Sequence, residues 1–201
     1  MDETQMPLVY ILVLNYCSLE DTLSCVASIR EVAYDRTRLL VIDNASPDNS
    51  GIELAKEIPP SEFLQLNSNH GYAEGNNIGI RIALKEGADY VLILNPDVRL
   101  PTDALSSYIE VMQSDREIGA LNPIQISADG LTIDRRFSWM IFGEVKSMTE
   151  LLSRPNDLFE PSVLLGAAIM FSSSAIKTVG LFDPLYFAYG EEVDLCRRMK
   201  Y

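Results

Sequence analysis

Residues 90–97 read Tyr90-Val91-Leu92-Ile93-Leu94-Asn95-Pro96-Asp97, an apolar run that ends in polar residues. Short apolar runs bounded by turn residues are typical of strands that are covered on both faces of a parallel sheet. Pro96 restricts the backbone directly after this strand, so the Asp97 carboxylate is expected to be rigidly placed. Carboxylate oxygens suit Mg²⁺ or Mn²⁺, and the sequence therefore predicts that Asp97 binds one of these ions.

Strand and helix patterns alternate on both sides of this run. Continuous apolar runs predict strands, and apolar residues near helical spacing, bounded by capping residues or proline, predict helices. Such alternation is typical of βαβ units, so we predict an α/β, Rossmann-like fold with a mostly parallel central sheet and helices on both faces. The strands are expected at 8–14, 39–42, 63–66 and 90–94, and the helices at 18–33, 49–58, 72–86 and 102–114.

The pattern is less regular from residue 119 onward. Residues 124–127 and 133–137 are short strand candidates, and a buried strand is expected at 163–171. A short helix is expected at 174–179, and a further helix begins near residue 190 and runs to residue 201. Because no terminating signal follows that last helix, we expect a fold that is truncated at its C-terminus.

Polar residues follow each of the four predicted parallel strands. In a parallel sheet the carboxyl ends of the strands meet at one edge, and ligands bind in the crevice outside that edge. We therefore expect four polar clusters to converge on one crevice. The alternative is that these residues are ordinary turn formers, which follow strands of any function. The clusters are Asn15, Asp43-Asn44, Asn67-Ser68-Asn69 and Asn95-Pro96-Asp97.

Composition narrows the range of partners. The chain has 201 residues and a formal net charge of −13, which argues against nucleic acid as a ligand because phosphate backbones are held mainly by Lys and Arg. An acidic protein that binds a pyrophosphate needs a cation, which again favours Mg²⁺ or Mn²⁺. The three cysteines suit a reducing compartment, and the sequence lacks both a signal-peptide pattern at residues 1–5 and an apolar run long enough to span a bilayer. We predict a cytoplasmic protein, with peripheral contact at the inner face of the membrane as a further option.

Five groups of residues form motif-like segments. They are Val41-Ile42-Asp43-Asn44-Ala45-Ser46-Pro47-Asp48-Asn49-Ser50, Asn69-His70-Gly71-Tyr72-Ala73-Glu74-Gly75-Asn76-Asn77-Ile78-Gly79, Leu92-Ile93-Leu94-Asn95-Pro96-Asp97-Val98, Gly166-Ala167-Ala168-Ile169-Met170 with Gly180-Leu181-Phe182-Asp183, and Gly190-Glu191-Glu192-Val193-Asp194-Leu195-Cys196-Arg197-Arg198. These segments resemble motifs of family 2 glycosyltransferases, which are inverting enzymes of the GT-A fold. The last three groups are similar to the rhamnosyltransferase-like branch of that family.

The resemblance implies roles for individual residues. Asp43 would hydrogen-bond the uracil or thymine base, and Asp97 would bind the metal. Asn95 occupies the first acidic position of the family's metal motif. The residues that the resemblance places around the nucleotide are Asn15, Asp43, Asn44, Ser46, Gly71, Asn76 and Asn95.

The acidic cluster Glu191, Glu192 and Asp194 supplies the predicted catalytic residues. An inverting transfer needs one carboxylate to take the proton from the acceptor hydroxyl. The family motif usually has its base at the second acid, which here is Glu192. The alternative is structural, because acids in the first turn of a helix complement the helix dipole and pair with later arginines such as Arg197 and Arg198.

The resemblance implies a single GT-A domain over residues 1–201. Residues 1–115 or so would bind the nucleotide sugar, and residues 116–201 would form an incomplete acceptor-side half. The apolar stretch 137–142 could belong to the hydrophobic core, to an acceptor pocket or to a surface that contacts a membrane. We expect transfer from a UDP- or dTDP-sugar donor to a hydroxyl of a glycan or lipid-linked acceptor in cell-surface polysaccharide synthesis. The alternatives are a sugar-1-phosphate nucleotidyltransferase and a non-catalytic nucleotide-sugar-binding module.

Overall fold

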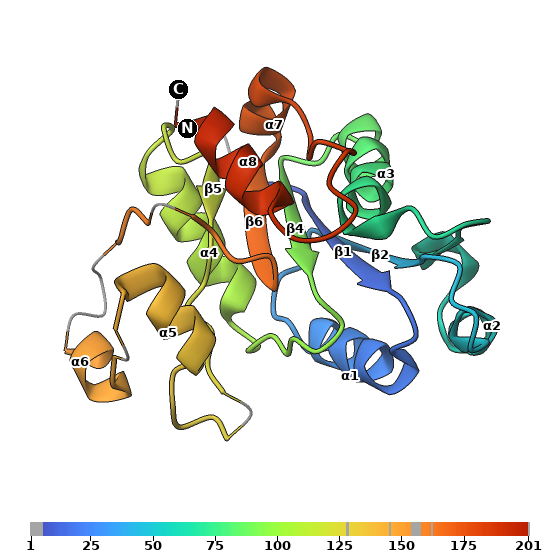
Figure 1. The fold of residues 1–201 in the computed structure, drawn as a ribbon, viewed down its shortest axis with the longest axis horizontal. Coiled ribbons are helices and arrows are strands. Elements are labelled where there is room, and N and C mark those ends of the chain that lie inside the picture. The colour runs from blue at the N-terminus through green and yellow to red at the C-terminus, as the bar shows by residue number, and fades with distance from the viewer. Residues whose placement is uncertain (1–5, 128, 145, 154–157, 162, 201) are drawn as a thin grey trace.

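The computed structural model describes residues 6–127, 129–144, 146–153, 158–161 and 163–200 (Figure 1). Its strands are Val9–Asn15 (β1), Thr37–Asp43 (β2), Phe63–Gln65 (β3), Tyr90–Leu94 (β4), Ala120–Leu121 (β5) and Ala168–Ser172 (β6). Its helices are Leu19–Arg30 (α1), Ser50–Glu57 (α2), Gly71–Lys85 (α3), Ala104–Ser114 (α4), Arg135–Phe142 (α5), Met148–Leu152 (α6), Ser173–Val179 (α7) and Glu191–Met199 (α8), with a 3₁₀ turn at Pro60–Glu62 (η1).

The strands form one six-stranded sheet in the order β3-β2-β1-β4-β6-β5. β3, β2, β1 and β4 are parallel to one another, while β6 lies antiparallel to both β4 and β5. The predicted mostly parallel α/β sheet is confirmed. β6 inserts beside β4, so the C-terminal part of the chain is joined directly to the parallel part of the sheet.

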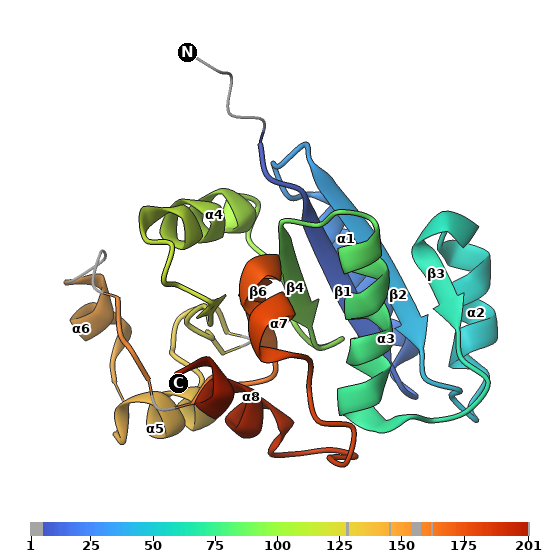
Figure 2. The same ribbon diagram turned by 90° about the horizontal axis from the view of Figure 1, so that it is seen from above.

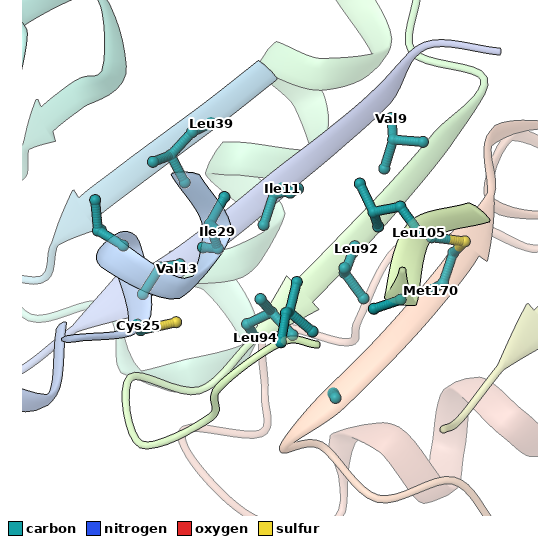
Figure 3. Packing of buried hydrophobic residues seen from close by; sticks show 14 of the residues in the cluster. Val9, Ile11, Val13, Cys25, Ile29, Leu39, Leu92, Leu94, Leu105 and Met170 are labelled. Atoms are coloured by element: carbon teal, nitrogen blue, oxygen red, sulfur yellow. The ribbon is translucent and has the colours of Figure 1, made fainter. Parts of the chain in front are cut away.

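Alternate residues of β1 point to opposite faces of the sheet, as the pleat requires. Val9, Ile11 and Val13 enter one buried cluster, together with Cys25 and Ile29 of α1 (Figure 3). Residues of α4 and α2, among them Leu105 and Leu54, complete this cluster. The helices α1, α2 and α4 therefore cover this face.

The other face carries α3, α7 and α8 (Figure 2). Tyr10, Leu12 and Leu14 of β1 belong to its buried cluster. α3 lies close to the sheet because Gly75 and Gly79 face it: a Cβ on Gly75 would stand 2.9 Å from Leu14, and one on Gly79 would stand 2.9 Å from Leu12. Helices are thus found on both faces, as predicted.

The second half departs from the sequence prediction in three places. Residues 133–137 are not a strand, because Asp134 accepts a hydrogen bond from the amide of Phe137 and so caps the start of α5. Residues 124–127 contribute only an isolated bridge between Ile126 and Ile133. The strand expected at 163–171 begins at Ala168, after a turn at residues 166–167.

The apolar stretch 137–142 forms most of α5 and divides its side chains between core and solvent. Phe137 is 2% exposed and packs with Ile133 and Leu165, whereas Trp139 is 56% exposed. The last predicted helix corresponds to α8, and residue 201 lies outside the described residues, as do residues 1–5. Over the described part of the chain, no helix combines the length and apolar character needed to cross a membrane.

Candidate active site

A cavity of about 410 Å³ opens at the carboxyl ends of the parallel strands. The residues that follow β1, β2 and β4 reach it, as the sheet topology requires. It is lined by Leu14, Tyr16, Ser18, Asp21, Asn44, Asn69, Gly71, Tyr72, Asn95, Pro96, Asp97, Phe187 and Ala188. None of these lining residues is Lys or Arg, so any anionic group that enters the pocket would need a cation from elsewhere.

Asn15 and Asp43 form a buried hydrogen-bonded pair beside the pocket without lining it. Both are 0% exposed, and the Asn15 amide donates to Asp43 Oδ1 at 2.6 Å. The same carboxylate accepts hydrogen bonds from Ser46 Oγ and from the Ser46 amide. Gln65 Nε2 donates to Asp43 Oδ2 at 2.6 Å. The predicted nucleotide residues Asn15, Asp43 and Ser46 therefore lie together, and the exposed Gln65 covers one carboxylate oxygen.

Asn44 organises the loop that precedes α3. Its Nδ2 donates to Asn69 Oδ1 and to the Gly71 carbonyl, and its Oδ1 accepts from the amide of His70. Asn76, also predicted to lie near the nucleoside, is fully buried and does not line the pocket. Its Nδ2 donates to the Tyr72 carbonyl, and its Oδ1 has no hydrogen-bond partner among the described residues.

Asn95 and Asp97 line the pocket directly after β4, where the sequence places them. Asp21, at the start of α1, lines the same pocket and lies 3.8 Å from Arg99. Mg²⁺ is commonly held by one or two carboxylates, with waters and substrate phosphates completing its shell. The donor set of Asp97, Asp21 and the Asn95 amide fits such an ion, although no group of three or more His, Cys, Asp and Glu side chains converges in the described ranges.

The three predicted catalytic acids stand at the start of α8 but differ in environment. Glu191 is 4% exposed, whereas Glu192 and Asp194 are partly buried. Asp194 is engaged by Arg198, whose Nε donates to Asp194 Oδ2 at 2.9 Å. Burial, followed by the nearby Glu192 carboxylate, raises the pKa of Glu191. Asp194 thus makes the pairing with a later arginine that the structural alternative expects, while neither Glu191 nor Glu192 forms an ion pair within the described part of the chain.

Tyr72 connects the pocket to this acidic pair and was not predicted from the sequence. Its ring lines the pocket, and its hydroxyl donates to the Gly166 carbonyl at 2.7 Å. A Cβ on Gly166 would lie 3.2 Å from the Tyr72 hydroxyl and 3.9 Å from Glu192 Oε1, so these two oxygens flank the same glycine. Burial raises the pKa of Tyr72, and the charges of Glu191 and Glu192 raise it further.

Asp21 and Gln65 are two further residues at this site that were not predicted from the sequence. Asp21 has the sequence signature of an acid in the first turn of a helix, which is common without any ligand. Gln65 ends a three-residue strand and carries no motif of its own.

The fold is that of a glycosyltransferase domain of the GT-A type. More particularly, the chain belongs to glycosyl transferase family 2, whose family model matches residues 9–180. A relative from Haloferax volcanii, the low-salt glycan biosynthesis hexosyltransferase Agl10, is 25% identical over 203 residues, covering 100% of this chain. The poly-beta-1,6-N-acetyl-D-glucosamine synthase of Staphylococcus aureus (strain COL) is 29% identical over 175 residues, covering 83% of this chain. This chain spans 64% of the first relative's length and 39% of the second's.

Two solved structures show the same fold. The mannosyltransferase PcManGT from Pyrobaculum calidifontis, in complex with GDP-Man and Mn²⁺, superposes with a TM-score of 0.68 at 17% identity, covering 98% of this chain and 52% of that one. S. aureus TarS 1–349, in complex with UDP-GlcNAc, gives a TM-score of 0.66 at 14% identity, covering 96% of this chain and 53% of that one. At these identities the likeness concerns the fold alone.

Proposed function

We propose that this chain is the donor-binding and catalytic part of an inverting, metal-assisted glycosyltransferase. It moves a sugar from a UDP- or dTDP-linked donor to a hydroxyl of a glycan or lipid-linked acceptor, in the synthesis of a cell-surface polysaccharide or glycan. The observation that carries the proposal is the position of Tyr72, which lines the pocket that contains Asp97 and also flanks Glu192. The named activities of the Haloferax and Staphylococcus relatives support the same class of reaction.

The nucleobase is recognised by Asp43. Gln65 is an exposed donor that occupies Asp43 Oδ2, in the way that the ring N–H of uracil or thymine would occupy it. Displacement of the Gln65 amide by the base would exchange one N–H donor for another, so the buried carboxylate would stay satisfied. Cytosine lacks that ring N–H, which makes this exchange selective for uracil or thymine. Asn15, Asn44, Ser46, Gly71, Asn76 and Asn95 shape the surrounding site.

The donor diphosphate requires a cation because the pocket lining supplies none. Asp97 would hold Mg²⁺ or Mn²⁺, with Asn95 and Asp21 beside it. A bound divalent ion supplies neutralisation of the diphosphate and so stabilises it as a leaving group. Both carboxylates lie at the carboxyl end of the sheet, where α/β proteins of this architecture bind their ligands.

Glu192 acts as the general base. Of the three acids at the start of α8, Asp194 is held by Arg198 and Glu191 is almost fully buried. Glu192 is the acid that remains both partly exposed and free of an ion pair among the described residues. It would accept the proton of the acceptor hydroxyl as the oxygen attacks the anomeric carbon from the side opposite the leaving diphosphate.

The acceptor-side half, from residue 116 onward, carries a surface suited to a membrane-bound acceptor. α5 exposes Arg135 and Arg136 beside Trp139 and Met140, and neither arginine forms an ion pair or hydrogen bond with a described residue. Arginine and tryptophan on one exposed helix face favour the interface of an anionic bilayer. A cytoplasmic protein that touches the inner face of the membrane there would reach a lipid-linked acceptor.

The experiment uses the full-length protein, and a thermal-shift screen with UDP-, dTDP- and GDP-sugars in Mn²⁺ selects the donor. Transfer is then followed on a membrane fraction that contains lipid-linked acceptors, and the anomeric configuration of the product is determined by NMR. Inversion is expected, and retention would contradict the mechanism. Pyrophosphate release from UTP and a sugar 1-phosphate would instead identify a nucleotidyltransferase. Donor binding without transfer to any acceptor would leave only a binding module.

A further inference from the structure

Glu191 is an unusual carboxylate in this site. It is the first residue of α8, it is 4% exposed, and its Oε2 has no hydrogen-bond partner among the described residues. The Oε2 atom of its neighbour Glu192 is likewise buried and without a partner there. A buried carboxylate beside a second, partly buried one is costly to ionise, because burial and mutual repulsion both favour the neutral acid.

The surrounding cations do not compensate Glu191. Arg198 is committed to Asp194 and to the carbonyls of Val179 and Leu181. Lys200 donates to the Pro161 carbonyl and lies 3.9 Å from Glu160. Arg197 on α8 and Lys177 on α7 are both exposed.

The groups that face Glu191 are themselves neutral or acidic. They are Glu192 on α8 and the hydroxyl-bearing ring of Tyr72 on α3. The backbone at the start of α8 does favour the ionised form of Glu191, but this contribution is smaller than that of burial. Cys196 is a third neutral group of α8 and lies near Glu192.

We propose that Glu191 keeps its proton at neutral pH and donates it in a hydrogen bond to Glu192. The inference rests on the proposed function in assigning Glu191 as a positioning residue that holds and orients the general base. The raised pKa of Glu191, which burial and then Glu192 cause, agrees with this arrangement. No atom is transferred in this role, since the proton stays on Glu191 throughout.

The first test measures the free energy of unfolding from about pH 4 to pH 9 for the wild type and Glu191→Gln, where Gln mimics the protonated acid. A carboxyl whose pKa is raised by folding contributes stability below its unfolded pKa of about 4.3, and this contribution is lost as the pH rises through the folded pKa. The free energy of unfolding of the variant should therefore rise relative to that of the wild type as the pH increases. If the wild type instead becomes more stable relative to the variant as the pH increases, Glu191 is ionised in the folded protein and the proposal is overturned.

A second measurement needs no variant. In wild-type protein labelled with ¹³C at the glutamate side-chain carboxyls, one signal should titrate well above the others in NMR spectra. If all glutamates titrate in the ordinary range, Glu191 is not protonated at neutral pH. Both measurements are independent of transfer, so they can succeed even if the proposed glycosyltransferase activity fails.

The positioning role is tested by turnover in the full-length protein. Glu191→Gln should exceed Glu191→Ala by about tenfold in kcat at similar donor KM, because only Gln can still donate to Glu192. Glu192→Gln provides the comparison for loss of the base itself. If Glu191→Gln loses as much turnover as Glu192→Gln, then Glu191 is needed as a carboxylate and the positioning role is wrong.

Discussion

Gly71 and Phe187 are in backbone contact although 116 positions separate them in numbering. A Cβ on Gly71 would overlap the carbonyl oxygen of Phe187, and the next amide, that of Tyr72, donates to the same oxygen at 2.7 Å. Gly71 also has a φ of +73°, which side chains rarely adopt. The start of α3 is thereby fastened to the loop that leads into α8.

Gly71→Ala should destabilise the protein for two reasons, the left-handed backbone and the overlap with Phe187. Gly87 supplies the matched control, because its φ is +80° but a Cβ there meets nothing within 4 Å. Gly87→Ala should cost only the backbone strain, about 1 kcal/mol. Urea unfolding of both variants should show a larger loss for Gly71→Ala. Equal losses in the free energy of unfolding would show that the contact with Phe187 does not contribute to the effect of Gly71→Ala.

Nucleotide affinity should depend on a divalent ion, because the pocket is lined by Asp21 and Asp97 and by no basic residue. Isothermal titration with UDP should show at least about tenfold weaker binding in EDTA than in Mn²⁺, which corresponds to roughly 1.4 kcal/mol. Asp97→Ala should remove most of this difference. Asp21→Asn should retain more of it, since Asp21 already lies beside Arg99. UDP affinity that is unchanged by EDTA in the wild type would rule out the metal.

Asp43→Ala should weaken UDP binding by about tenfold or more, because a buried hydrogen bond to a charged group contributes roughly 1.5–3 kcal/mol. The variant should also unfold more easily, since Asn15, Ser46 and Gln65 lose an acceptor. Gln65→Ala serves as the control: it uncovers Asp43 Oδ2 without removing the carboxylate, so UDP affinity should not fall. Competition titrations that find UDP and CDP equally effective in the wild type would refute base recognition by Asp43.

Glu192→Gln should lower turnover by about 10²- to 10⁴-fold while donor affinity changes little, because the base acts on the acceptor. Asp194→Asn weakens the pair with Arg198, which also binds the Val179 and Leu181 carbonyls. Its larger effect should therefore fall on stability. Steady-state kinetics and unfolding curves for both variants decide the assignment. Selective loss of turnover in Asp194→Asn would transfer the role of base to that residue.

The elements with strong local patterns could be predicted from the sequence. β1 and β4 are uninterrupted apolar runs, and α3 has apolar residues at helical spacing, so local chemistry was sufficient there. β5 could not be found because two residues show no periodicity. The strand expected at 133–137 failed because the capping interaction of Asp134 outweighed the apolar character of the segment. The antiparallel direction of β6 depends on tertiary pairing with β4, which no local pattern encodes.

The sequence predicted which residues belong to the candidate site better than it predicted how they are arranged. The position of Asn95 and Asp97 after β4 follows from topology, and both line the pocket. That Asn15, Asp43 and Ser46 bond to one another depends on distances between separate loops. The role of Tyr72 was hidden for the same reason, since its hydroxyl partner is 94 residues away in the chain.

The buried cluster beneath α3 has a consequence for any attempt to divide this chain. Ala73 and Ile80 of α3 share that cluster with Phe171, Phe182 and Leu195, which all come from the second half. A fragment that stops near residue 115 would leave the β6 side of β4 unpaired and uncover apolar side chains on one face of the sheet. Such a fragment should aggregate or remain partly folded, and complementation with a separately expressed second half would be needed to restore it. The donor site and the acids at the start of α8 would therefore belong to one cooperatively folded unit. Recombination that exchanged only one half of the chain would disrupt both.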